Sequence, residues 1–233
     1  FGATAGKYAL WDESADSWII SGTQSTVTAG TSNYIAGVNA GNSIASGGNY
    51  NVTIGDEAGT ALTTGDGNVA IGFEALTTED TRGNNTAVGY RTLKVLNAGA
   101  EGYNVAIGFD AGLAMTTGVQ NTVVGALAGD AITTGDYNTG VGIHAIGGTT
   151  TADGNTGIGY NVMAENTTGA SNTAVGRNAL DSNTTASNNT AVGAYALDVN
   201  TTGAGNTAVG YQALDVNTTA SDNVAIGIHA LGA

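Results

Sequence analysis

Hydrophobic and polar residues recur along this chain with a fixed period from residue 51 almost to its end. Each copy of the pattern begins with Asn and continues with Val or Thr, a mostly small residue, Val or Ile, and then Gly. The copies follow a 17-residue period, and a single step, from Asn85 to Asn104, is longer by two residues. The eleven copies start at Asn51, Asn68, Asn85, Asn104, Asn121, Asn138, Asn155, Asn172, Asn189, Asn206 and Asn223. A short, constant period is typical of a solenoid, in which each repeat forms one coil stacked on its neighbours.

Numbering each copy from its Asn as position zero separates two faces of a predicted strand. Side chains of a strand alternate between its sides, so positions one and three share one face and positions two and four share the other. We expect the first face, of Val, Ile and Thr, to point into the coil. We expect the second face, mostly Ala at position two and always Gly at position four, to pack closely against another chain. A second interpretation is that Gly provides a positive φ at a corner. This Gly column comprises Gly55, Gly72, Gly89, Gly108, Gly125, Gly142, Gly159, Gly176, Gly193, Gly210 and Gly227.

The remaining positions predict a corner and a polar return. Positions five and six vary between copies, which indicates an exposed corner, and position eight is Leu, Ile or Met in most copies, which predicts a further core residue. We expect Asn at position zero to form a ladder, with each amide side chain bonded to the coils above and below. The two extra residues between Val95 and Tyr103 fall in a return and should bulge outward.

Residues 1–48 differ from the regular repeat domain, which we assign to residues 49–233. Two apolar segments, Tyr8 to Trp11 and Ser17 to Ile20, flank a mostly polar stretch, and this pattern predicts a β-hairpin. Both tryptophans lie there, and we expect the hairpin to cap or anchor one end of the stack; a sugar or partner site on these rings is the alternative. Residues 31–50 retain traces of the repeat, as expected of a degenerate terminal coil. The predicted fold is therefore all-β, a parallel β-roll or β-solenoid with an N-terminal hairpin.

Composition and charge narrow the functional classes. Gly accounts for 38 of 233 residues, Pro and Cys are absent, and 10% of the residues are charged. The net charge is −14 with five Lys and Arg residues, which disfavours nucleic-acid binding because that binding needs clustered positive charge. No apolar run is long enough to span a bilayer, so we expect no membrane partner. The chain starts at Phe1 without a signal peptide, and we expect it to be part of a longer or processed polypeptide.

No catalytic motif stands out from the repeat. His144 and His229 both occupy position six, and five coils of about 4.8 Å would separate them by about 24 Å, too far to share a metal. Asp residues occur singly in corners and returns, whereas Ca²⁺ takes six to eight oxygen ligands. We therefore predict no enzymatic activity, no cofactor and no metal.

The phrase Asn-Thr-Ala-Val-Gly-Tyr-Gln-Ala-Leu at residues 206–214, with its Asn-Thr-Thr-Gly returns, resembles repeats of bacteriophage tail fibres. Such repeats often lie upstream of a self-cleaving endosialidase-type chaperone domain. Residues 68–72 and 223–227 are also similar to the head repeats of trimeric autotransporter adhesins. The resemblance covers residues 49–233 but departs in period, which is shorter in the adhesins. It implies a left-handed β-roll in which three copies of the chain lie side by side around one axis.

We therefore expect a rigid structural segment of a trimeric phage tail fibre, located on the virion tail and supporting host attachment. The expected partners are two further copies of the chain, adjoining fibre or tail proteins, and a glycan or protein of the host surface. A bacterial trimeric surface adhesin or extracellular filament is the alternative. Ice binding is a third hypothesis, because regular Thr columns on a solenoid can match ice; the expected inward direction of Thr at position one disfavours it.

Overall fold

The structure is a computed structural model that describes residues 8–12, 17–21 and 30–232. These residues form strands and turns and no helix. Accordingly, the described part of the chain contains no helix long and apolar enough to cross a membrane.

The N-terminal hairpin predicted from the sequence is confirmed. β1 (Tyr8–Asp12) and β2 (Ser17–Ser21) pair in antiparallel orientation, with Trp11 opposite Trp18. The connection between the two strands, residues 13–16, lies outside the described residues.

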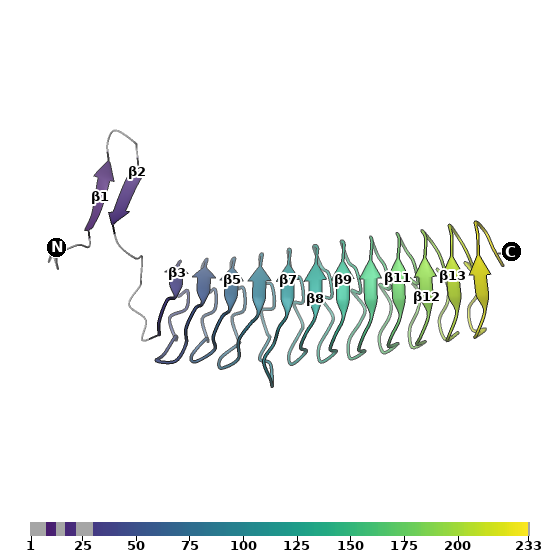
Figure 1. The fold of residues 1–233 in the computed structure, drawn as a ribbon, viewed down its shortest axis with the longest axis horizontal. Helices are drawn as coiled ribbons and strands as arrows, with labels where there is room; N and C mark the ends of the chain where they lie inside the picture. Colours follow the sequence, from purple (N-terminus) through teal and green to yellow (C-terminus); the bar gives the residue numbers. More distant parts are fainter. Residues whose placement is uncertain (1–7, 13–16, 22–29, 233) are drawn as a thin grey trace.

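All other strands form one parallel sheet along the solenoid (Figure 1). The strands follow one another in the sheet in sequence order, and each coil contributes one three-residue strand made of repeat positions one to three. Equivalent positions face each other, as Thr156 of β10 faces Thr173 of β11. The strands are β3 (Tyr34–Ala36), β4 (Val52–Ile54), β5 (Val69–Ile71), β6 (Thr86–Val88), β7 (Val105–Ile107), β8 (Thr122–Val124), β9 (Thr139–Val141), β10 (Thr156–Ile158), β11 (Thr173–Val175), β12 (Thr190–Val192), β13 (Thr207–Val209) and β14 (Val224–Ile226). The predicted parallel β-solenoid of 17-residue coils is therefore confirmed, and its first strand comes from the degenerate segment before residue 48.

The prediction of which strand face points into the coil is wrong. Position two is buried in every strand from β4 to β14, whereas positions one and three are half-buried or exposed. Ala191 has no exposed surface, while the adjacent Val192 is 36% exposed. The Ala-rich face therefore lines the interior, and the Val, Ile and Thr face lies outside.

The narrow interior of the coil explains this reversal. A Cβ added to Gly140, at position two, would lie 2.6 Å from Cγ1 of Ile146, at position eight of the same coil. Because position eight reaches across the coil and interiors are close-packed, mostly small residues fit opposite it. A β-branched residue at position two occurs where position eight is Gly, as in the pairs Thr53 with Gly59 and Val123 with Gly129.

A third buried position completes this compensation of volume. In the three coils with Gly at position eight, position eleven is Leu62, Met115 or Ile132, and all three side chains are fully buried. A Cβ on Gly129 would lie 2.8 Å from Cδ1 of Ile132, so the larger side chain at position eleven fills the space that position eight leaves. Positions two, eight and eleven therefore share one core volume within each coil.

Gly at position four is required by the backbone for two reasons. Its φ lies between 124° and 142° in all eleven coils, a region that residues with a Cβ rarely adopt. A Cβ on Gly55 would also lie 2.7 Å from the carbonyl oxygen of Gly72 in the next coil. The positive φ expected at this corner is thus present. The close packing at this Gly joins consecutive coils of one chain. The prediction that the Ala and Gly face meets another chain is therefore wrong, because position two points into the coil and position four contacts the next coil.

Candidate functional site

A continuous strip of β-branched side chains, here called the outer face, consists of positions one and three of β4 to β14, with Val or Thr at position one and Val or Ile at position three. Position three is Val or Ile in every coil, and Ile158 and Val192 are 41% and 36% exposed. With strands about 4.8 Å apart and a rise of at most about 3.3 Å per residue, the outer face and its borders cover at most about 53 Å by about 20 Å, or about 1,000 Å². Contiguous apolar surface beyond a few hundred Å² marks an interaction site in soluble proteins. The outer face is therefore the candidate functional surface of this chain.

Two columns border the outer face, one on each side of the strands. The position-five column follows the Gly corner and carries Phe73, Tyr90 and Phe109 in consecutive coils. Their rings stack, with centroids 5.3 Å apart for Phe73 and Tyr90 and 5.4 Å apart for Tyr90 and Phe109. Since the rings cover one another's faces, this column presents ring edges to a partner.

The second border is the residue that precedes each Asn, here called position minus one. It carries Tyr50, Tyr103 and Tyr137, which are 66%, 55% and 58% exposed. In other coils it is Gly, Asn, Gln, Ser or Asp. The two borders therefore add exposed aromatic residues to the aliphatic centre of the outer face.

The Asn residues at position zero form a buried ladder. The backbone N–H of Asn68 donates to Oδ1 of Asn51 at 2.8 Å, and Nδ2 of Asn51 donates to the carbonyl oxygen of Gly65 in its own coil at 2.8 Å. The first of these bonds recurs at every step along the eleven coils. Bonds between two amide side chains occur in only some coils, for example from Nδ2 of Asn138 to Oδ1 of Asn121 at 3.1 Å. The ladder therefore joins side chains mainly to backbone, and it is structural, because it lies inside the solenoid.

A second Asn ladder, at position eleven, was missed by the sequence analysis. Nδ2 of Asn183 donates to Oδ1 of Asn166 at 2.7 Å in the preceding coil and to the carbonyl oxygen of Ala186 at 2.9 Å. Asn200 and Asn217 continue the column. These residues were interpreted as turn residues of the return. The available signal was that Asn occupies position eleven only in coils with a large residue at position eight.

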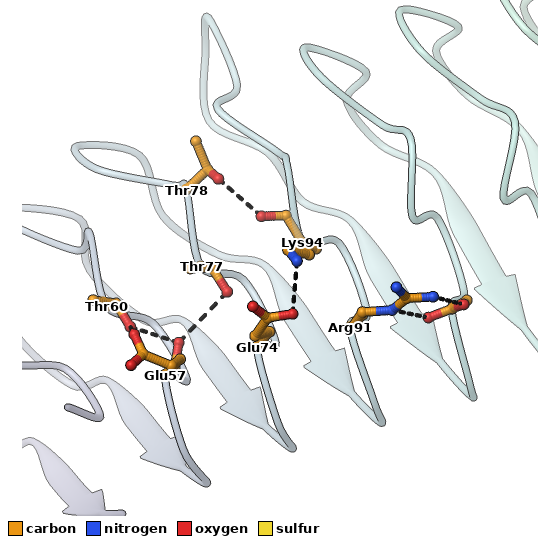
Figure 2. Close-up of polar contacts among 8 residues, drawn as sticks. Glu57, Thr60, Glu74, Thr77, Thr78, Arg91 and Lys94 are labelled. Atoms are coloured by element: carbon orange, nitrogen blue, oxygen red, sulfur yellow. Dashed lines mark hydrogen bonds and ion pairs between the residues drawn. The ribbon is translucent and has the colours of Figure 1, made fainter. Parts of the chain in front are cut away.

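Charged residues cluster around the irregular coil, residues 85–103, whose return projects beyond its neighbours as expected (Figure 1). Figure 2 shows the contacts of Lys94 and Arg91, which reach in opposite directions along the solenoid. Nζ of Lys94 lies 2.6 Å from Oε2 of Glu74 in the preceding coil. Nε of Arg91 donates at 2.9 Å to Oδ1 of Asp110 in the following coil, and its Nη2 contacts Oδ2. Both pairs are partly buried, and each links two coils that are neighbours along the solenoid, so we assign them a local structural role.

Glu79 is the buried charge that holds this irregular return. It occupies position eleven, and its carboxylate accepts hydrogen bonds from the backbone N–H of Ala98 at 3.0 Å and of Arg82 at 3.2 Å. Burial raises the pKa of the Glu79 carboxyl group, and the two backbone hydrogen bonds oppose that shift. Glu79 therefore orders the longer return at a cost in desolvation.

Acidic side chains also line position nine near the C-terminus. Asp181, Asp198 and Asp215 occupy this position in three consecutive coils. Burial and the two neighbouring carboxylates raise the pKa of Asp198. Within the described residues, no group of three or more His, Cys, Asp and Glu side chains is arranged to hold a metal ion.

The two histidines lie in separate coils, and the His229 ring packs edge-on against Tyr211 with centroids 5.5 Å apart.

Comparisons with protein-family models, with curated proteins and with solved structures found no match to this chain. Its function must therefore be argued from its own geometry. The main surface feature of the described residues is a long strip of Val, Ile and Thr side chains bordered by exposed aromatic residues.

Proposed function

We propose that this chain is a rigid structural segment of a trimeric fibre of the bacteriophage tail-fibre kind, in which three copies lie side by side. The observation that carries the proposal is the outer face, whose side chains are half-buried or exposed along all of β4 to β14 in the single chain. In this proposal the segment acts as a spacer that supports host attachment, with adjoining fibre proteins and a host glycan or protein as further partners. The left-handed winding implied by the resemblance stays a prediction.

The size of the outer face supports burial against copies of the same chain. Together with its two borders it covers at most about 1,000 Å², which is comparable with the roughly 800 Å² that each partner contributes to a stable protein interface. The face is also long and straight, as a side-by-side fibre requires. The partner-facing surface is thus the Val, Ile and Thr side of the sheet, and no longer the Ala and Gly side proposed from the sequence.

Charged substitutions on either side of one strand test this assignment. Val192→Asp places a carboxylate on the outer face, so we expect a folded chain whose self-association is at least 100-fold weaker, because unpaired charges would be buried between copies. Ala191→Asp places the same charge inside the coil and should unfold it locally. Thr185→Asp, on the exposed return, is the matched control and should leave both properties unchanged.

Light scattering with circular dichroism would measure both effects. The wild-type mass should be three times the 22.8 kDa of one chain, and that of Val192→Asp should approach one chain. A wild-type protein of a single-chain mass would contradict the proposal. A bacterial surface adhesin or filament built on the same trimer remains the alternative; an encoded membrane anchor next to this segment would favour it, and neighbouring tail genes would favour the phage fibre.

Ice binding is a second candidate function, because one structural observation favours it. Thr at position one lies on the outer face and recurs in six consecutive strands, from Thr122 to Thr207. The inward direction that disfavoured ice binding is therefore wrong. Since a trimer would bury these residues, the two functions exclude each other on this face. Thermal hysteresis of a single-chain species would favour ice binding.

A further inference from the structure

We infer that the three chains run parallel without offset, and that the position-five column of one chain packs coil for coil against the position-minus-one column of the next. This inference rests on the proposed function, because it specifies how the outer faces meet. It names the residues at the seam between two chains, where glycines of one chain receive aromatic rings of its neighbour.

The sizes of the residues in the two columns complement each other within each coil. Position minus one is Gly in three of the eleven coils, and in all three position five is an exposed aromatic residue. These pairs are Gly67 with Phe73, Gly154 with Tyr160 and Gly205 with Tyr211. Four coils have Tyr or Gln at position minus one, and in three of them position five is smaller. These are Tyr50 with Asp56, Gln120 with Ala126, and Tyr137 with Ile143.

One coil departs from this pattern. Tyr103 and Phe109 are both large, and Tyr103 directly follows the return that contains the two extra residues. The two extra residues change the course of the chain just before position zero of this coil, so we expect the contact between chains to differ there.

Packing within one chain does not account for the complementarity. The two residues of a pair lie six positions apart, on opposite sides of the strand and at most about 20 Å from each other. Gly154 has φ of 68°, and Tyr137 adopts φ of 60° at the same repeat position. The nearest heavy atom to a Cβ on Gly154 is Oγ of Ser171, at 3.8 Å. The single chain therefore has room for a side chain at Gly154. A Cβ on Gly67 or Gly205 would come closest to the end of a flexible side chain of the next coil, at 3.2 Å from Oδ1 of Asn84 and at 2.6 Å from Oδ1 of Asp222. A neighbouring chain is thus the explanation that covers the small residue at Gly154.

Symmetry selects the arrangement. In a cyclic, parallel assembly, one border of each chain meets the opposite border of the next at the same height, and the ring closes. A two-fold antiparallel pair would bring like borders together. An offset pair would match residues from different coils. The observed complementarity of residue size relates opposite borders of the same coil. Of these arrangements, the parallel one without offset is the one that brings such residues together.

Disulfide trapping tests the seam, because the chain has no cysteine of its own. Under oxidation, Gly154→Cys with Tyr160→Cys should give a covalent three-chain band on a non-reducing denaturing gel. Each single variant should stay a one-chain band, because its three copies lie too far apart for the Cα separation of a disulfide. Gly154→Cys with Ala194→Cys is the offset control, because Ala194 occupies position five two coils after Tyr160. Two coils add about 10 Å to the separation, so this pair should not form a disulfide.

Exchange of size across the seam gives a second, independent measurement. Gly154→Tyr should weaken trimer formation at least 100-fold, and the additional change Tyr160→Ala should restore it to within about tenfold of the wild type. Light scattering over a dilution series measures both, with circular dichroism to show that each chain is folded.

Dimers from a single-cysteine variant, or cross-linking of the offset pair, would overturn the inference. So would a trimeric double-cysteine variant that stays uncross-linked, or Gly154→Tyr remaining fully trimeric; in these two cases the proposed function stands. A single-chain wild-type mass would instead remove the proposed function itself.

Discussion

Replacing Gly159 by Ala tests the corner geometry that lets the coils stack. Gly159 has φ of 142°, and a Cβ there would lie 2.6 Å from the carbonyl oxygen of Gly176 in the next coil. The backbone strain costs about 1–3 kcal/mol, and relieving the collision costs a further 1–3 kcal/mol or so by analogy with overpacking. We therefore expect Gly159→Ala to lower the free energy of unfolding by about 2–6 kcal/mol.

Urea denaturation followed by circular dichroism would measure this loss. Gly99→Ala is the matched control, because a Cβ on Gly99 would have no heavy atom within 4 Å and its φ is not positive. Its free energy of unfolding should stay within about 0.5 kcal/mol of the wild type. If Gly159→Ala were as stable as Gly99→Ala, the account of the Gly column would be refuted.

Two further predictions concern the interior. Gly129→Ile alone should destabilise the chain by about 1–3 kcal/mol, because a Cβ there would lie 2.7 Å from Val123 and 2.8 Å from Ile132. Adding Val123→Gly and Ile132→Thr copies the residues of the next coil and should recover most of that loss, as measured by urea denaturation. If stability did not recover, the three positions would not share one core volume. Burial raises the folded-state pKa of Glu79 above its unfolded value, so its destabilising contribution is present above the folded pKa and disappears as the pH falls through it. The melting temperature of the wild type should therefore gain a contribution from Glu79 between neutral and mildly acidic pH, and Glu79→Gln should remove that part of the pH dependence; an unchanged pH profile would argue against a raised pKa.

The sequence was sufficient to predict stacked coils, their period and the single parallel sheet, because a constant spacing of Asn and Gly leaves few other folds. It also located the Asn ladder and the positive φ of Gly55 and its equivalents. The direction of the strand faces could not be read from the same pattern. Period-two alternation separates two faces but does not say which is inside, and the usual rule that the larger apolar residues are buried fails in a coil this narrow.

The width of the coil decides which strand face points inward, and residues outside the strand, at position eight of the repeat, set that width. Leu180, at position eight, adopts a positive φ of 56°, and its fully buried side chain lies in the narrow interior that position two also lines. A positive φ is uncommon for Leu, so sequence reasoning had no ground to expect it. Once that side chain occupies the interior, Ala174 is the size that position two permits, and Val175 is left outside. The candidate surface was therefore misassigned by one residue, which in a strand reverses every side chain.

The most direct test of side-by-side association is the mass per unit length of the particle in solution, from small-angle X-ray scattering. One coil of the repeat has a mass of about 1.7 kDa, taken from 22.8 kDa for 233 residues, and rises about 4.8 Å. Three parallel chains should give about 1.0 kDa per Å. A value of about 0.35 kDa per Å, whatever the total mass, would mean single or end-to-end chains with the outer face open to water, and would contradict the account.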